Sequence, residues 1–344
     1  MSDFTLTVLN PRGRDPEQYF PDHAGDPAVT VPAPVNYHAY AACVAGSYQR
    51  DVRKAIGLEK PVLMLIRQDL AVSLKALRQV KDAGLTVAVT LKETGYHQFH
   101  KLLGNGGKIR RFREILQLAD GVVSPTQALL PVYRLLREGR PPQSCRFIAT
   151  PYPIEDPRWD FSLPMEERAG IFVGTRELKT ASRNHLQCLV LVKALATELG
   201  CPVGIVNSEG RRLEKVLQSL DFPLRQTEIR TRMTVVDYLR FTARFRIIFQ
   251  LDQSMVPGQV AGDSCMTRQI TVGGNGSVDQ LVFGPFCADG QDRERPIEAA
   301  RRLLTDDEYY RAAVEESMAA ARRYLSYEHA AQELRSFYES ISSR

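Results

Sequence analysis

Residues 62–90 read VLMLIRQDLAVSLKALRQVKDAGLTVAVT, which divides into a strand, a helix and a second strand. The outer runs are short and apolar, whereas Leu74, Leu77 and Val80 recur between them at the spacing of one helical face. Gly84 follows as the C-cap of that helix. Two strands joined by a crossover helix form a parallel pair, so this segment predicts an α/β protein with a doubly wound parallel sheet.

The same alternation of strand and helix extends along the chain. Further strands are expected near 4–9, 121–124, 146–149, 170–173, 203–206, 246–251 and 269–272. Further helices are expected near 108–118, 127–138, 183–199, 213–220, 234–243 and, interrupted near 325–327, over 296–340. Residues 150–165 contain four prolines and predict a linker. We therefore expect two doubly wound domains, 1–160 and 161–325, with a C-terminal helix over 326–344.

Composition excludes several classes of protein. The 344 residues are 44% hydrophobic and 25% charged, which is not typical of a disordered or fibrous chain. No run approaches the roughly 18 apolar residues of a membrane helix, and the N-terminus lacks the basic and apolar segments of a signal peptide. The scattered cysteines indicate neither a disulfide framework nor a zinc site. These features predict a cytoplasmic protein.

Positive charge is concentrated in the N-terminal half. Residues 1–165 hold 21 Lys and Arg against 16 Asp and Glu, whereas the rest of the chain holds 24 of each. The formal net charge of +5 is too small for a dedicated nucleic-acid binder, so no nucleic-acid partner is expected. The excess suits an anionic ligand or an anionic membrane surface.

A glycine and two cations follow the expected strand at 170–173. Gly174 would let a ligand approach the backbone, while Arg176 and Lys179 could neutralise a diphosphate as a bond to it breaks. The ordinary alternative is a turn whose cations face water. A second loop contains Gly274 and Asn275, whose backbone amides could hold a phosphate or sugar hydroxyls, although such residues are also common in turns.

These residues resemble the GT-B nucleotide-sugar glycosyltransferases, and glycosyltransferase family 4 in particular. In that family a strand, Gly-Arg and a later Lys open the C-terminal domain, and Gly174, Arg176 and Lys179 match this pattern with the arginine one position late. Residues 81–89 and 118–127 and the closing helix are similar to further stretches of the family. The resemblance implies a GT-B fold, in which two Rossmann-like domains face each other across a cleft and a C-terminal helix crosses back to the N-domain.

The family usually carries two glutamates eight positions apart around a glycine-rich loop. Asp263 matches the second, whose carboxylate accepts hydrogen bonds from the donor ribose, but Met255 stands at the place of the first. Asp252 or the backbone at Pro257 and Gly258 would have to supply the missing sugar contact. The alternative for Asp263 is a helix N-cap or first-turn acid.

The resemblance also implies sugar and acceptor contacts in the N-domain. A histidine in the loop after the strand at 86–90 commonly contacts the donor sugar in this family, which makes His97 or His100 the candidate. Glu93 is a candidate base or acceptor ligand. Gly13 follows the first strand and could meet the acceptor or a phosphate. The alternative for a lone loop histidine is a structural role.

Residues 108–116 combine four cations with Ile109, Phe112, Ile115 and Leu116 on one helical face. Related enzymes dock on anionic membranes through such a helix, which implies peripheral contact with the inner face of a membrane. The alternative is an amphipathic helix that packs on the core.

The residues and the resemblance together predict transfer of a sugar from a nucleoside diphosphate to an acceptor hydroxyl on a glycan or lipid-linked precursor. The resemblance implies a retaining reaction in which Arg176 and Lys179 bind the donor diphosphate, with no metal and no cofactor beyond the nucleotide sugar. Two alternatives are a GT-B binding subunit without catalysis, which the missing first acid favours, and a nucleotide-sugar epimerase. The motifs of P-loop kinases, Rossmann dehydrogenases and nucleophile-elbow hydrolases are absent from suitable strand–helix junctions.

Overall fold

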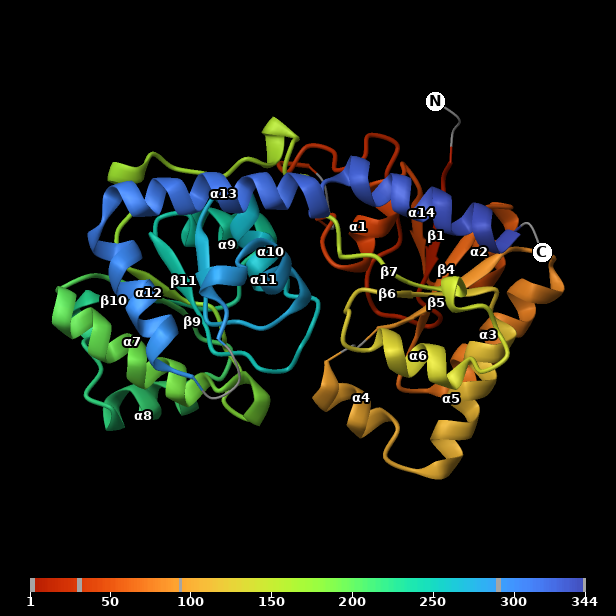
Figure 1. The fold of residues 1–344 in the computed structure, drawn as a ribbon, viewed down its shortest axis with the longest axis horizontal. Coiled ribbons are helices and arrows are strands. Elements are labelled where there is room, and N and C mark those ends of the chain that lie inside the picture. The colour runs from red at the N-terminus through yellow and green to blue at the C-terminus, as the bar shows by residue number, and fades with distance from the viewer. Residues whose placement is uncertain (1–3, 30–32, 93–94, 289–291, 343–344) are drawn as a thin grey trace. The chain divides into compact units, whose positions relative to one another are not determined.

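The computed structural model describes residues 4–29, 33–92, 95–288 and 292–342, and it divides into two compact units. Unit 1 comprises Met1–Pro153 together with Leu325–Arg344, and unit 2 comprises Ile154–Tyr324 (Figure 1). The end of the chain therefore belongs to the same unit as its beginning.

Unit 1 contains a seven-stranded sheet in the order β2-β3-β1-β4-β5-β6-β7. All neighbours are parallel except β2, which is antiparallel to β3. The strands are β1 (Thr7–Leu9), β2 (Gln18–Tyr19), β3 (Ser47–Gln49), β4 (Val62–Ile66), β5 (Val87–Leu91), β6 (Gly121–Ser124) and β7 (Cys145–Phe147). The sequence patterns did not predict β2 and β3, because neither contains a run of apolar residues.

Helices cover both faces of this sheet (Figure 1). They are α1 (Tyr37–Ala42), α2 (Val52–Gly57), α3 (Leu70–Asp82), α4 (Tyr96–Leu102), α5 (Gly106–Leu118), α6 (Leu130–Leu136) and α14 (Tyr327–Ser342). Alternate residues of β4 enter two separate cores: Met64 packs with α3 and α5, whereas Leu63 packs with α1 and α14. The hydroxyl of Tyr338 in α14 donates to the carbonyl of Val62 at 2.8 Å, which fixes the closing helix on unit 1.

Unit 2 contains a five-stranded, fully parallel sheet in the order β10-β9-β8-β11-β12. Its strands are β8 (Ile171–Val173), β9 (Val203–Val206), β10 (Thr227–Arg230), β11 (Ile247–Phe249) and β12 (Ile270–Val272). Its helices are α7 (His185–Leu199), α8 (Arg211–Ser219), α9 (Val235–Thr242), α10 (Gln259–Met266), α11 (Ser277–Val282), α12 (Glu294–Thr305) and α13 (Asp307–Leu325).

The strand order of unit 2 reverses direction beside β8. The chain first builds outward through β9 and β10, then returns to the other side of β8 with β11 and β12. In open α/β sheets, ligands bind outside the carboxyl ends of the strands at such a switch point. The loops that follow β8 and β11 are therefore the first place to look for a binding site.

Candidate functional site

Three loops of unit 2 meet at the carboxyl edge of its sheet. Asn184, at the end of the loop after β8, donates from its side-chain amide to the carbonyl of Leu251 in the loop after β11 at 2.9 Å. The amide of Gln253 donates to the carbonyl of Ser182 at 2.8 Å. The amide of Asn275, after β12, donates to the carbonyl of Asp252 at 3.1 Å. The sequence-predicted loops around 174–184, 250–258 and 273–276 thus form one continuous edge.

Asp252 supplies the buried ionic contact of this edge. One carboxylate oxygen pairs with the guanidinium of Arg183, while the other accepts from the backbone amide of Ser254 at 2.9 Å and from the Ser254 hydroxyl. Both oxygens are engaged within unit 2, so Asp252 ties the loops together. The spacing of 69 residues between Arg183 and Asp252 left no sequence signal for this pair.

Arg176 and Lys179 lie exposed in the loop after β8. The carbonyl of Arg176 accepts from the hydroxyl of Ser208 at 2.8 Å, which anchors the backbone of the loop to the neighbouring loop after β9. Among the residues that the structure describes, neither Arg176 nor Lys179 has a salt-bridge partner for its side chain. Two cations at the switch point are therefore available to an anion from solution, whereas Arg183 in the same loop is occupied.

The predicted glycines lie at this edge, where each also meets a local packing or backbone requirement. A Cβ on Gly174 would lie 2.9 Å from the side chain of Ile248 and 3.1 Å from that of Val260, so Gly174 permits α10 to pack on the sheet. A Cβ on Gly274 would overlap the carboxylate of Asp279. Gly258 has a φ of 94°, which favours glycine, and is the N-cap of α10. These glycines serve close packing within unit 2.

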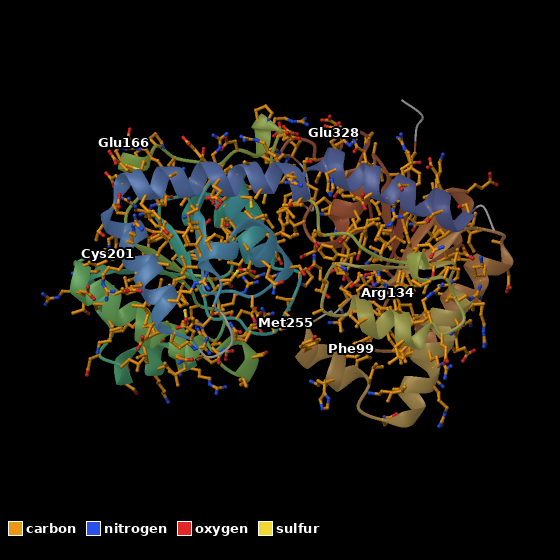
Figure 2. The ribbon with its side chains drawn as sticks, viewed as in Figure 1. Phe99, Arg134, Glu166, Cys201, Met255 and Glu328 are labelled. Carbon is orange, nitrogen blue, oxygen red and sulfur yellow. The ribbon has the colours of Figure 1, made fainter. Side chains whose placement is uncertain are left out.

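Asn275 clamps the loop after β11 through its side chain. Its Oδ1 accepts from the backbone amide of Met255 at 3.1 Å, and its Nδ2 donates to the side chain of Gln253 at 3.0 Å. Met255, at the position of the missing glutamate, has a φ of 50° and lies at the edge of unit 2 (Figure 2). The side chain of Asn275 therefore holds the shape of the site.

Asp263 is the fifth residue of α10, so the alternative of an N-cap or first-turn acid is wrong. Its side chain is buried, and Oδ1 has no hydrogen-bond partner among the described residues. Burial raises the pKa of Asp263 to about 8, against an opposing attraction from Arg176. Two of the predicted donor-site residues thus influence each other electrostatically, and burial favours the protonated form of the Asp263 carboxyl.

Two further ionisable groups at this edge were missed from the sequence. Asp279 in α11 accepts from the side-chain amide of Gln250 at 2.8 Å, and burial together with the nearby Asp252 raises its pKa to about 7. His185, the first residue of α7, shares a hydrogen bond of 2.8 Å with the hydroxyl of Thr175, and burial lowers its pKa to about 4. Neither residue belongs to a recognisable motif.

The remaining candidates belong to unit 1. Gly13 closes a turn in which its amide donates to the carbonyl of Asn10 at 2.8 Å. His97 and His100 lie in α4, so the prediction of a loop there is wrong: Gly95 precedes a short helix. Glu93 and the side chain of His97 lie outside the described residues. The structure therefore brings together the predicted donor residues of unit 2 and leaves the N-domain candidates in a separate unit.

Comparison with known proteins defines the fold. No protein-family model and no curated protein sequence matches this chain. Among solved structures, HepE of Anabaena in complex with UDP aligns at 11% identity and a TM-score of 0.65, covering 99% of this chain and 100% of that chain. Trehalose 6-phosphate synthase of Burkholderia multivorans aligns at 11% identity and a TM-score of 0.65, covering 99% of both chains.

A mutant of S. aureus TarM, solved in complex with UDP, aligns at 10% identity and a TM-score of 0.61. The alignment covers 87% of this chain, which spans only 59% of the length of the TarM chain. Together these likenesses show that the chain has the GT-B fold, with two Rossmann-like domains, as the sequence predicted.

Proposed function

We propose that this protein is a glycosyltransferase that moves a sugar from a nucleoside-diphosphate sugar to an acceptor hydroxyl. The observation that carries the proposal is a pair of exposed cations, Arg176 and Lys179, which have no salt bridge within the described part of the chain and lie at the switch point of a GT-B domain. In the reaction, the bond between the anomeric carbon and the diphosphate oxygen breaks and its electrons leave with the diphosphate. The acceptor oxygen bonds to the anomeric carbon and releases its proton.

Arg176 and Lys179 act on the leaving diphosphate in this proposal. Negative charge on the diphosphate grows as the bond breaks, so cations held beside it stabilise the transition state more than the ground state. Arg183 is excluded from this role because Asp252 occupies its guanidinium. We propose that the two cations perform this task without a metal or a further cofactor.

Asp263 is proposed to contact the donor ribose through Oδ1. This buried oxygen has no partner among the described residues, and an unsatisfied buried polar atom is costly. A protonated carboxyl both donates and accepts, so it suits a ribose hydroxyl. Gly258, Gly274 and Asn275 support the proposal by shaping the loops around the donor.

The proposals for the acceptor and its contacts are based on the sequence alone. We propose a glycan or lipid-linked acceptor, with His97, Glu93 and Gly13 as its contacts or those of the donor sugar, and retention of anomeric configuration by resemblance to glycosyltransferase family 4. We also propose a cytoplasmic location with peripheral contact between residues 108–116 and the inner face of a membrane.

The direct test is turnover of UDP-, GDP- and ADP-sugars, with release of the nucleoside diphosphate and free or transferred sugar measured by mass spectrometry. One donor should be consumed, and Arg176→Ala or Lys179→Ala should lower kcat by roughly 100-fold or more. Arg225→Ala, which removes an exposed cation near the amino end of β10, is the matched control and should keep full activity. Chelation of divalent metals should leave the rate unchanged. Equal losses in all three variants would contradict the proposal.

The second candidate is a binding subunit without catalysis. The hydrogen bond from the Met255 amide to Asn275 favours this candidate. Position 255 then offers a sugar neither an acidic side chain nor a free backbone amide. Tight binding of a nucleotide sugar without turnover of any donor would favour the binding subunit.

A further inference from the structure

The buried carboxyl of Asp279 contacts several loops at the carboxyl edge of the sheet in unit 2. Asp279 is the third residue of α11 and is 2% exposed. Its Oδ1 accepts a hydrogen bond of 2.8 Å from the side-chain amide of Gln250, which directly follows β11. The backbone amides of Gly276 and of Asp279 itself also donate to the carboxyl. One side chain of α11 is thus bonded both to the end of β11 and to the loop after β12.

Three glycines of the same edge leave room for this carboxyl. A Cβ on Gly274 would lie 2.1 Å from Oδ1 of Asp279, and a Cβ on Gly276 would lie 2.7 Å from Oδ2. A Cβ on Gly258, the N-cap of α10, would lie 3.0 Å from Oδ2. An alanine at either of the first two positions would overlap the carboxyl. The backbone of two separate loops is therefore fitted closely to the side chain of Asp279.

Packing alone does not account for an acid at this position. A carboxyl group that is removed from water costs free energy, and an apolar side chain of similar size would fill the space without that cost. Among the described residues no cation forms a salt bridge with Asp279, and burial together with the nearby Asp252 raises its pKa. Buried ionisable groups of this kind cluster at functional sites.

We infer that Asp279 is a positioning residue for the nucleotide donor. It acts through the backbone of Gly258, Gly274 and Asn275, the residues that are proposed to shape the loops around the donor, rather than through contact with the donor itself. Loops that are already held in the binding shape lose less conformational entropy when a ligand binds, so the carboxyl of Asp279 strengthens binding. The inference rests on the proposed function for the identity of the ligand, but the contacts of Asp279 do not depend on it.

The effect of Asp279 on the loops is tested by hydrogen exchange of the full chain without any nucleotide. The backbone amides of Asn275 and Ser277 donate to carbonyls of the loop after β11 at 3.1 Å and 2.9 Å, so their exchange reports whether the loops stay together. Asp279→Ala should speed exchange in peptides that contain these amides by about tenfold or more. Val282→Ala, which truncates a buried residue at the other end of α11, is the matched control and should leave this exchange unchanged. Equal exchange in the two variants would overturn the inference.

The effect on the ligand is tested by calorimetric titration of UDP, GDP and ADP. The nucleotide that the unaltered protein binds should bind Asp279→Ala about tenfold or more weakly, because the loops must then become ordered on binding. Asp279→Asn keeps the shape and the acceptor for Gln250, so it should restore the affinity to within about threefold. Unchanged affinity in Asp279→Ala, or an equal loss in Asp279→Asn or Val282→Ala, would contradict the inference. If none of the three nucleotides binds the unaltered protein, the proposed function fails, whereas the exchange measurement still decides whether Asp279 holds the loops.

Discussion

The guanidinium of Arg183 pairs with the buried carboxylate of Asp252, which holds the loop after β8 against the loop after β11. This contact fixes the edge on which Arg176 and Lys179 stand. A buried ion pair that loses one partner leaves an uncompensated charge. The pair therefore offers a direct test of how the edge is built.

Arg183→Ala should lower the free energy of unfolding of unit 2 by roughly 3 kcal/mol, because among the described residues the carboxylate of Asp252 then keeps Ser254 alone as a side-chain partner. Arg176→Ala, the same change in the same loop, should lie within about 0.5 kcal/mol of the unaltered protein. Urea unfolding followed by the fluorescence of Trp159, which is buried in unit 2, measures both. Equal effects of the two variants would show that the ion pair does not hold the edge.

Gly274→Ala should destabilise unit 2 by about 1–3 kcal/mol, because a Cβ there overlaps the carboxylate of Asp279 and its partner Gln250. Gly284→Ala is the matched control, since a Cβ at Gly284 meets no atom within 4 Å. The same fluorescence measurement compares them. A stable Gly274→Ala protein would mean that the loop after β12 adapts more freely than its packing indicates.

The stability of unit 2 should fall as the pH rises from about 4 to 8. The pKa of Asp263 is 3.8 in the reference state and about 8 in the fold, so between these values the folded protein holds a proton that the unfolded chain has lost. The slope should reach about 1.4 kcal/mol per pH unit for this group. Asp279, with its pKa raised to about 7, adds in the same direction. His185, with its pKa lowered from 6.5 to about 4, opposes this fall below about pH 6.5.

Asp263→Asn cannot ionise and should reduce this slope, whereas Asp221→Asn at an exposed position of unit 2 should not. Unfolding free energies at pH 5 and pH 8 give the comparison. Identical slopes in all three proteins would remove Asp263 as the source of the pH dependence.

The regular elements of the fold could be predicted because their own residues show the apolar spacing typical of a strand or a helix. β4, α3 and β5 follow from two apolar runs, a helical apolar face and the glycine at 84. The N-cap Asp69 was not predicted, and the C-cap is Ala83 rather than Gly84. β10 was missed because its residues are half-buried or exposed at the edge of the sheet, so no apolar alternation marks them. α4 was missed because its seven residues begin only a few positions after β5, where a loop is the ordinary expectation.

The position of the candidate site could be predicted from the sequence, but the contacts of its side chains could be predicted less well. Gly174, Arg176 and Lys179 could be placed at a strand end from local sequence. The occupation of Asp252 by Arg183, and the packing of Gly274 on Asp279, depend on residues brought together from different strands. Burial of Asp263 likewise depends on how α10 packs, which no short motif specifies.

The central claim is that Arg176 and Lys179 bind the diphosphate of a nucleotide donor. Isothermal titration of UDP, GDP and ADP, each beside its monophosphate, into the unaltered protein and the Arg176→Ala and Lys179→Ala variants tests it most directly. One diphosphate should bind more tightly than its monophosphate, and each variant should weaken it roughly tenfold or more, since each removes a charge-assisted hydrogen bond. Binding of a diphosphate with unchanged affinity in both variants would contradict the account.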